Sequence, residues 1–185
     1  IFIRENMNTR VRGRKDLDDL SVPFIGEIPL AICGKKKVKS HEAHTIVVKE
    51  GSRDIMNEAF RVLRTNLEFM IGKDRSSNVI VITSFNPGSG KSFLTMNIAM
   101  SLAIKNKKVL VIDGDLRHAS ASAYIHSPEV GLSNYLGGQV DELSDIIVTD
   151  KQHPSFSFIP VGTIPPNPTE LLFNDRLQDA IHTLK

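Results

Sequence analysis

The fold of this chain is decided by the stretch Thr83-Ser84-Phe85-Asn86-Pro87-Gly88-Ser89-Gly90-Lys91-Ser92. An apolar, β-branched run (78–83) precedes it and predicts a buried strand, and a run that is apolar almost all round (93–104) follows it and predicts a buried helix. In such a Gly-rich turn, backbone N–H groups point into one concavity at the helix N-terminus, where the helix dipole favours a polyphosphate. The stretch therefore predicts a phosphate-binding loop.

The loop predicts a nucleoside triphosphate and Mg²⁺ as its ligands. Lys91 would reach the β- and γ-phosphates, and the Ser92 hydroxyl would ligate the metal. The strict loop pattern has Gly where this chain has Phe85, so the alternative is a Gly-rich strand–helix turn with an exposed lysine. The predicted cofactor-binding residues are Pro87, Gly88, Ser89, Gly90, Lys91, Ser92 and Phe93.

Outward from the loop, the pattern strand–helix–strand predicts an α/β fold. The apolar run 109–112 predicts a second buried strand, parallel to the first with a right-handed crossover, and 155–160 alternates as a third. Asp113 and Asp115 follow the second strand, at the sheet edge where open α/β folds bind ligands. We expect one of them to hold Mg²⁺ through water and the other to accept a proton from an incoming hydroxyl. Solvated carboxylates in a strand-terminal turn are the alternative, and the partner of Arg117, a carboxylate or a phosphate, stays open.

The helix expected from Ser52, as N-cap, to about residue 71 carries two patterns. Apolar residues recur at steps of three and four, which predicts one buried stripe formed by Met56, Phe60, Leu63, Leu67 and Met70. Glu58, Arg61 and Arg64 step by three and are expected to project away from the core together. Such a row is either a solvated face with weak ion pairs or a set of pairing groups for another subunit.

Other elements are predicted more locally. We expect a short helix at 16–20, an edge strand at 23–29, an extended piece at 45–48, and helices at 132–136 and 143–148. The last helix is expected to be capped by Asn167, with Pro168 at its first position and Glu170 completing a capping box. Its buried face would consist of Leu177, Ile181 and Leu184.

Composition narrows the class of protein. With 185 residues, 41% apolar and 24% charged, the chain suits one globular domain, and a net charge of +2 gives no reason to expect nucleic acid as a partner. The basic residues cluster near the N-terminus and at 35–39, and such clusters could lie against an anionic membrane surface or nucleic acid, while the cluster at 35–39 could equally be a solvated loop. The single cysteine, Cys33, excludes a disulfide framework, and His41 and His44 lack the further ligands of a metal site.

These motifs together resemble those of the bacterial tyrosine kinases (BY-kinases) of capsule and exopolysaccharide synthesis. The stretch 84–92 is similar to the family's Walker A segment, and Asp113-Gly114-Asp115-Leu116-Arg117 to its Walker A′ motif. The run 58–64 has the form of its Glu-x-x-Arg-x-x-Arg oligomerisation motif. The segments 23–29 and 165–172 also match family segments, so the resemblance covers nearly the whole chain in the right order.

The resemblance implies an ATP-dependent protein-tyrosine kinase with a P-loop NTPase-like, three-layer fold and a mostly parallel sheet. It implies that Lys91, Asp113 and Asp115 are catalytic, that Ser92, Asp113 and Asp115 bind Mg²⁺, and that Glu58, Arg61 and Arg64 form the contact of a homo-oligomeric ring. Further partners would be the tyrosine-rich tail of a neighbouring subunit and the polysaccharide export machinery, at the cytoplasmic side of the bacterial inner membrane.

The same resemblance implies a division of the chain and its extent. Residues 1–51 would be a juxtamembrane segment with an edge strand and a basic loop, and residues 52–185 the N-terminal part of the kinase domain. The family's Walker B motif and tyrosine cluster do not occur in this sequence, so we expect a fragment with an incomplete sheet that turns over little by itself.

Two other functions fit parts of the sequence. A partitioning or division-site ATPase shares the broad fold, but it carries a signature lysine where this chain has Asn86. A non-catalytic scaffold of a polysaccharide export complex is the second alternative, and it would differ from a kinase in lacking nucleotide binding.

Overall fold

The computed structural model describes residues 13–17, 20–29, 44–72 and 78–185. The α-helices are α2 (Ile55–Ile71), α3 (Lys91–Ala103), α4 (Leu132–Leu136), α5 (Pro168–Leu172) and α6 (Asp175–Thr183). The strands are β1 (Val109–Ile112), β2 (Val148–Thr149) and β3 (Phe156–Ile159). Short 3₁₀ helices, labelled η, cover η1 (Arg14–Leu17), η3 (Ser122–Ile125) and η4 (Leu143–Ile146).

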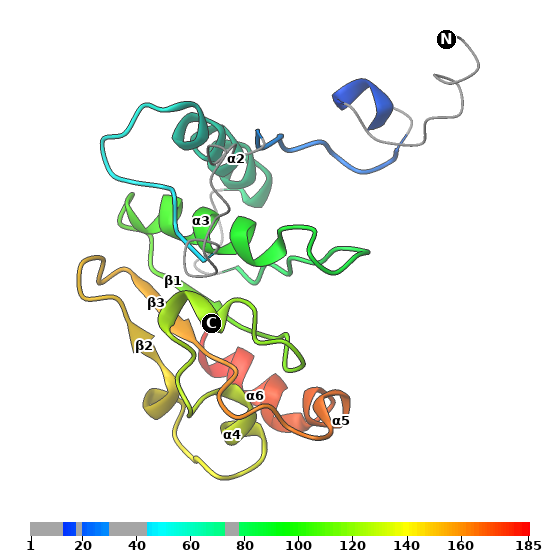
Figure 1. The fold of residues 1–185 in the computed structure, drawn as a ribbon, viewed down its shortest axis with the longest axis vertical. Coiled ribbons are helices and arrows are strands. Elements are labelled where there is room, and N and C mark those ends of the chain that lie inside the picture. The colour runs from blue at the N-terminus through cyan, green and yellow to red at the C-terminus, as the bar shows by residue number, and fades with distance from the viewer. Residues whose placement is uncertain (1–12, 18–19, 30–43, 73–77) are drawn as a thin grey trace, which may run out of the picture.

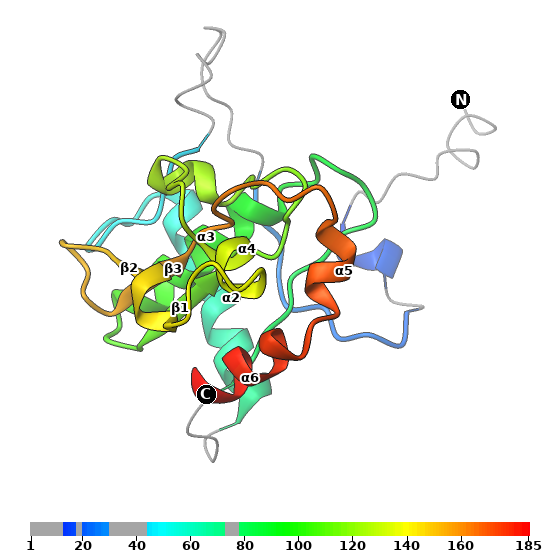
Figure 2. The same ribbon diagram turned by 90° about the horizontal axis from the view of Figure 1, so that it is seen from below.

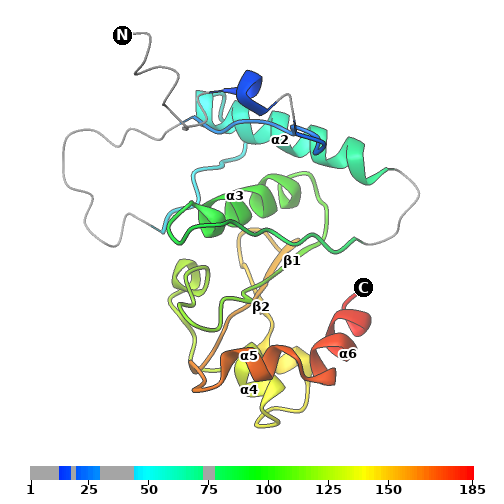
Figure 3. The same cartoon turned by 90° about the vertical axis from the view of Figure 1, so that its right-hand side faces the viewer.

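The layers follow the predicted α/β plan. The sheet has the order β1-β3-β2, and α2 and α3 lie on one face while α4, α5 and α6 lie on the other (Figures 1 and 3). Strands β1 and β3 pair in parallel, with Val109 opposite Phe156 and Ile112 opposite Ile159. Because β1 is covered on both faces, its side chains alternate between two apolar clusters, which explains its unbroken apolar sequence.

Each face of the sheet has its own core. The first lies towards α2 and α3 and contains Phe60, Leu63, Met96, Met100, Val111, Phe156 and Phe158. The second lies towards α4 and α6 and contains Leu116, Leu132, Leu136, Ile146, Ile159 and Val161. The short helices around the second core are therefore anchored by apolar burial rather than by their own length.

The segment before α2 is fixed to α3 by one side chain. Asn97 is fully buried, and its Oδ1 accepts hydrogen bonds from the backbone N–H groups of Val47 (2.7 Å) and Val48 (3.1 Å). Its Nδ2 donates to the Phe93 carbonyl of the same helix at 2.8 Å. Residues 45–48, expected to be extended, belong to no strand, but Val48 is in the first core and Ile46 and Val47 pack against it. The domain boundary at 51 stays a prediction.

The strand predicted over 78–83 is wrong for the structure observed. In the described part of the chain the strand pairings are β1–β3 and β2–β3, and 78–83 belongs to neither. Val79, Ile80 and Val81 are 54%, 46% and 84% exposed, and only Ile82 packs against the first core. A β-branched sequence supplies a preference for extended backbone, but a strand also needs a neighbour to complete its hydrogen bonds.

The edge strand expected at 23–29 is not formed either. The Ile25 carbonyl accepts a hydrogen bond from the Asn66 side chain of α2 at 2.8 Å, so this segment packs along a helix instead of joining the sheet. The helix expected at 16–20 overlaps the 3₁₀ helix η1 at its first two residues, and positions 18 and 19 of that prediction lie outside the described residues.

Helix α2 starts later than predicted. Its N-cap is Asp54 rather than Ser52: Asp54 Oδ1 accepts from the Asn57 N–H at 2.9 Å, and the Ser52 hydroxyl donates to Asp54 Oδ2 at 2.6 Å. The hydrogen bond from Ser52, followed by that from Asn57, lowers the pKa of the Asp54 carboxyl. The expected stripe is buried at Phe60 and Leu63 and half-buried at Met56 and Leu67, but Met70 is 52% exposed near the end of the helix.

Two helix predictions in the C-terminal half are also corrected. In place of a helix over 143–148, η4 is followed by β2, whose β-branched residues pair antiparallel with Phe158 and Ser157. The last helix is divided into α5 and α6 (Figure 2), because Asn174 caps a second helix by accepting from the Arg176 N–H at 3.0 Å. The expected capping box is absent at α5, where the Asn167 amide instead donates to the Glu170 carboxylate.

Candidate phosphate-binding and metal site

A cleft of about 390 Å³ brings together two parts of the chain that are distant in sequence. One wall is the loop before α3, and the other is the segment that follows β1. The lining residues are Ser84, Phe85, Asn86, Pro87, Gly88 and Lys91 from the loop, with Asp115, His118 and Ser120 opposite. The lysine and one carboxylate predicted from sequence therefore face the same space.

The loop holds its shape through glycine conformations and serine hydroxyls. Gly88 and Gly90 have φ angles of 72° and 87°, in the left-handed region that glycine adopts without strain. The hydroxyls of Ser84 and Ser89 both donate to the Asn86 carbonyl, at 2.9 and 2.6 Å. Phe85, which occupies the position of the usual glycine, is 99% exposed, so its bulk meets no obstacle here.

Helix α3 begins directly at the loop. Lys91 is its first residue, and Gly90 is the N-cap, whose carbonyl accepts from the Leu94 N–H at 2.8 Å. The first N–H groups of an α-helix have no partner within the helix, so this end is suited to an anion. Ser89, Gly90, Ser92 and Phe93 lie on the loop and first turn, and the Phe93 ring packs against Phe60 with centroids 5.8 Å apart. Phe93 can therefore offer a phosphate its backbone N–H rather than its side chain.

The two predicted aspartates occupy different environments. Asp113 is 5% exposed, and its backbone N–H donates to the Ile159 carbonyl at 3.0 Å, which continues the β1–β3 pairing. Asp115 lies in the cleft, and its Oδ1 is 3.2 Å from both the backbone N and the Nδ1 of His118. The Asp115 N–H donates back to Asp113 Oδ1 at 3.2 Å, so the backbone turns between the two carboxylates.

Of the three predicted metal ligands, Asp115 lines the cleft, whereas Ser92 and Asp113 do not. A serine hydroxyl and carboxylates are hard oxygen donors that suit Mg²⁺, which keeps several water ligands and is bound by one or two carboxylates with phosphate oxygens. Within the described ranges, no three His, Cys, Asp or Glu side chains are grouped as a metal cage. The residues therefore fit a metal that arrives with a polyphosphate.

His118 and Ser120 were not predicted as site residues. Their only sequence signal is their position a few residues after the aspartate pair, and a histidine or serine there has no motif of its own. The hydrogen bond that the structure shows for Arg117 goes to neither predicted partner, since its Nη2 donates to the Thr169 hydroxyl of α5 at 3.3 Å. Pairing of Arg117 with a phosphate stays a prediction.

The expected row of Glu58, Arg61 and Arg64 is wrong as a shared face. Glu58 and Arg61 form an ion pair on the outer side of α2, but Arg64 is only 8% exposed. Its Nη1 donates to the Ser101 carbonyl (2.8 Å) and hydroxyl (3.1 Å) of α3. Each step of three falls about 60° short of a full helical turn, so two steps rotate Arg64 by about 120° from Glu58 and towards the core.

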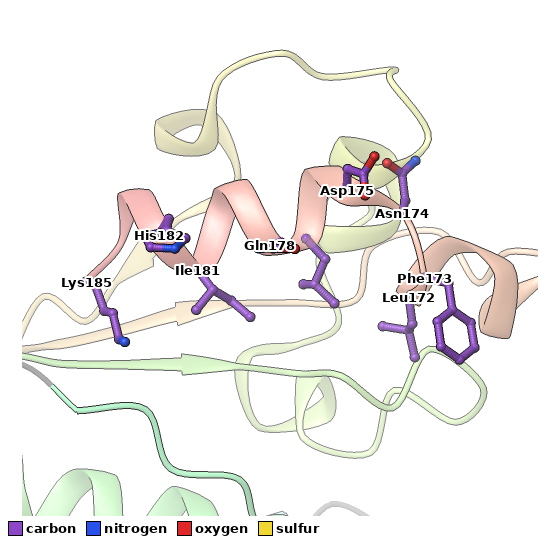
Figure 4. A pocket seen from close by; sticks show the side chains of 9 residues that line it. Leu172, Phe173, Asn174, Asp175, Gln178, Ile181, His182 and Lys185 are labelled. Carbon is purple, nitrogen blue, oxygen red and sulfur yellow. The ribbon is translucent and has the colours of Figure 1, made fainter.

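A second hollow, of about 380 Å³, lies along α6 and the turn before it. Figure 4 shows side chains of Leu172, Phe173, Gln178 and Ile181 along it, with His182 and Lys185 near its end. None of the predicted site residues lines it, so it is separate from the phosphate-loop cleft. No helix within the described residues has both the length and the apolar character needed to cross a membrane.

Comparison with known proteins gives the site a context. The family described as the CobQ/CobB/MinD/ParA nucleotide binding domain matches residues 80–164, which include the loop and both aspartates. The tyrosine-protein kinase etk of Escherichia coli is 41% identical over 128 residues, covering 67% of this chain and 17% of that protein. The chain spans about a quarter or less of the length of the curated relatives it matches.

Solved structures of bacterial tyrosine kinase domains are also similar to this chain. The chimerical protein CapA2B2 is 30% identical with a TM-score of 0.73, and the match covers 92% of this chain and 69% of that one. The BceF tyrosine kinase domain is 39% identical with a TM-score of 0.66, covering 77% of this chain and 57% of that domain. With its phosphate loop and paired aspartates arranged on an α/β sheet, this chain belongs to the bacterial tyrosine kinase family.

Proposed function

We propose that this chain supplies the ATP site of a protein-tyrosine kinase of the polysaccharide co-polymerase type, which regulates capsule or exopolysaccharide synthesis and export. The observation that carries the proposal is the single cleft lined by Lys91 and by Asp115. Its relatives are tyrosine kinases, and bacterial kinases of this kind would act at the cytoplasmic side of the inner membrane, with ATP and Mg²⁺.

In phosphoryl transfer, a protein contributes mainly by positioning the reacting groups and by stabilising the negative charge of the phosphates. Lys91 would neutralise charge on the β- and γ-phosphates, and the N-terminus of α3 would hold the same oxygens through backbone N–H groups. Ser92, Asp113 and Asp115 would be the residues to hold Mg²⁺, which would supply positive charge to offset that of the phosphates. Asp115 would accept the proton of an incoming tyrosine hydroxyl, a role supported by its position in the lining of the open cleft.

Replacing Asp115 with Asn tests this assignment. We expect transfer of phosphate from ATP to tyrosine to fall by about 100-fold, since an amide cannot accept the proton, while the nucleotide affinity measured without Mg²⁺ changes by less than about threefold. Both measurements use the full-length protein. Radiolabel transfer measures phosphorylation of tyrosine, and titration with a fluorescent ATP analogue measures nucleotide affinity.

The matched control is Asp179→Asn, which changes an exposed aspartate on α6 and should alter neither quantity. Equal losses of transfer and affinity in Asp115→Asn would argue against a catalytic role. ATP hydrolysis without transfer would favour the nucleotide-switch ATPase, and no nucleotide binding at all would favour the scaffold.

We also propose that the outer side of α2 contacts a neighbouring subunit in a homo-oligomeric ring, which would present its tyrosine-rich tail to this cleft beside the polysaccharide export machinery. The Glu58–Arg61 pair lies on that side, next to Ile55, Val62 and Phe69, which are 78%, 54% and 89% exposed. Their spacing of seven places these three apolar side chains in one stripe. An exposed apolar stripe beside charged groups supports a protein contact.

The variant Arg61→Ala distinguishes an effect on subunit association from an effect on the stability of the fold. We expect the subunit dissociation constant to rise by about tenfold, as for an arginine near the centre of an interface, with no change in the unfolding temperature. Sedimentation velocity over a range of concentrations gives the first quantity and thermal melting the second. Lys151→Ala, on the turn between β2 and β3, is the control, and an unaltered sedimentation profile in Arg61→Ala would contradict the proposed contact.

A further inference from the structure

We propose that Ser122 is a positioning residue for Asp113, one that holds one carboxylate oxygen so that the other is presented to the metal of the phosphate site. The inference rests on the proposed function, because it concerns how Asp113 would serve Mg²⁺. It is carried by a buried hydrogen-bond chain that runs from the end of β3 through η3 to the end of β1.

The contacts of the Asp113 carboxylate are unequal. Oδ2 accepts two hydrogen bonds from one residue, the Ser122 N–H at 2.7 Å and the Ser122 hydroxyl at 2.7 Å. Oδ1 accepts one, from the Asp115 N–H at 3.2 Å. A carboxylate has roughly four lone-pair positions, two on each oxygen. Oδ2 is therefore filled by Ser122, and Oδ1 is the oxygen that keeps an open position.

The direction of the Ser122 proton is also fixed. Its Oγ accepts a hydrogen bond from the Val161 N–H at 2.9 Å. A hydroxyl that accepts from Val161 has its single proton left for a different partner, and Asp113 Oδ2 at 2.7 Å is that partner. Val161, Ser122 and Asp113 thus form one chain in which each donor has one acceptor.

Burial makes this chain strong enough to set the orientation of the carboxylate. Ser122 is 1% exposed, Val161 is fully buried, and Asp113 is 5% exposed. Water therefore does not compete for the hydrogen bonds between these residues. Hydrogen bonds to an ionised carboxylate are shorter and stronger than neutral ones, and a low local dielectric increases their effect. The carboxylate is consequently held in one rotation about its Cβ–Cγ bond.

That rotation matters for a metal held through water or directly by one oxygen. Residues that orient a metal ligand typically contribute 10- to 100-fold to metal affinity when they are removed one at a time. With the Ser122 hydroxyl absent, Oδ2 would lose one of its two bonds and the carboxylate could turn, so that neither oxygen is presented reliably. The loss should appear as a weaker response to Mg²⁺, not as a loss of the nucleotide site itself.

Ser122→Ala tests the inference. It removes the hydroxyl but keeps the backbone N–H, so the carboxylate keeps one of its bonds to residue 122. We expect the Mg²⁺ concentration for half-maximal binding of a fluorescent ATP analogue to rise by about 10-fold or more, while metal-free nucleotide affinity is unchanged. Tyrosine phosphorylation at saturating Mg²⁺ should recover most of the wild-type rate. The protein as its gene encodes it is used throughout.

Ser133→Ala is the matched control. Ser133 is 5% exposed, and its hydroxyl donates to the Thr163 carbonyl and lies 3.5 Å from Asn134 Oδ1. This variant, like Ser122→Ala, therefore removes a hydroxyl with two hydrogen-bond contacts, but it touches neither aspartate. Both variants should melt at a lower temperature, and only Ser122→Ala should shift the Mg²⁺ response. If Ser122→Ala does not fold, Ser122→Cys, which keeps the volume with a much weaker donor, is measured in its place.

The outcomes separate the inference from the proposed function. If the wild-type protein binds no nucleotide, the proposed function fails. If it binds nucleotide in a Mg²⁺-dependent way and Ser122→Ala shows the wild-type Mg²⁺ response, the positioning role is overturned while the function stands. Equal Mg²⁺ shifts in Ser122→Ala and Ser133→Ala would also overturn it, because the effect would then follow from general loosening.

Discussion

Replacing Lys91 with Met should weaken nucleotide binding by about 100-fold and abolish phosphate transfer to tyrosine. Lys91 lines the cleft at the first position of α3, and methionine matches the length of its side chain without the charge. The β- and γ-phosphates would then lose their cationic partner where the backbone N–H groups alone cannot balance them. A fluorescent ATP analogue measures the affinity, and transfer from labelled ATP measures the chemistry.

Lys105→Met is the control for this change. Lys105 lies just after α3, at the end away from the phosphate loop, and its side chain is exposed. Both variants remove one positive charge, so a general electrostatic effect would appear in both. Unchanged nucleotide affinity in Lys91→Met would exclude the loop as the phosphate site.

Gly162→Ala should have the largest effect on stability, a loss of about 3 kcal/mol or more in the free energy of unfolding. Gly162 has a φ of +78°, and a Cβ there would lie 2.2 Å from Asn134 Oδ1 and 2.4 Å from the Gly131 nitrogen. The obstructing atoms belong to the tight junction between the end of β3 and α4, where the Leu132 and Ser133 N–H groups donate to the Pro160 and Val161 carbonyls. That junction cannot move aside without breaking these bonds.

Gly51→Ala isolates the steric part of this prediction. Gly51 has a similar φ of +74°, but a Cβ there meets nothing within 4 Å. Its replacement should therefore cost only the backbone strain of a left-handed alanine, about 1 kcal/mol. Urea unfolding of the two variants measures the difference, and equal losses would show that the close approach of Gly162 to Gly131 is not tight in solution.

The sequence was most informative for elements that are apolar on nearly all sides, because their burial can be predicted from their own residues. Strand β1 and helix α3 are apolar on nearly all sides, so their type and position followed from local pattern alone. The run 78–83 has the same apolar character, but a strand depends on a neighbour whose position is not encoded locally. Asn174 similarly divided the C-terminal helix because its side chain found a backbone N–H, a competition that periodicity does not reveal.

The candidate site was predictable to the level of its motifs and no further. Glycine and lysine spacing predicts a phosphate loop, and the position of the aspartates after β1 predicts that they lie near it, where Asp115 shares a cleft with Lys91. The sequence does not reveal that Asp113 is buried while Asp115 is accessible, because the partner of Asp113 is Ser122, which lies nine residues on in a short 3₁₀ helix. The predicted row puts Arg64 on the wrong face of α2, because residues three apart do not form a straight row along an α-helix.

The two hydrogen bonds that Asn97 accepts from residues 47 and 48 have a mechanical consequence. Asn97 is six residues, or about 9 Å, from Lys91 along a single rigid helix. A force applied to the chain ahead of α2 cannot displace residues 47 and 48 without either breaking two hydrogen bonds or carrying α3 along with them. Helix α3 therefore connects the N-terminal segment mechanically to the phosphate loop.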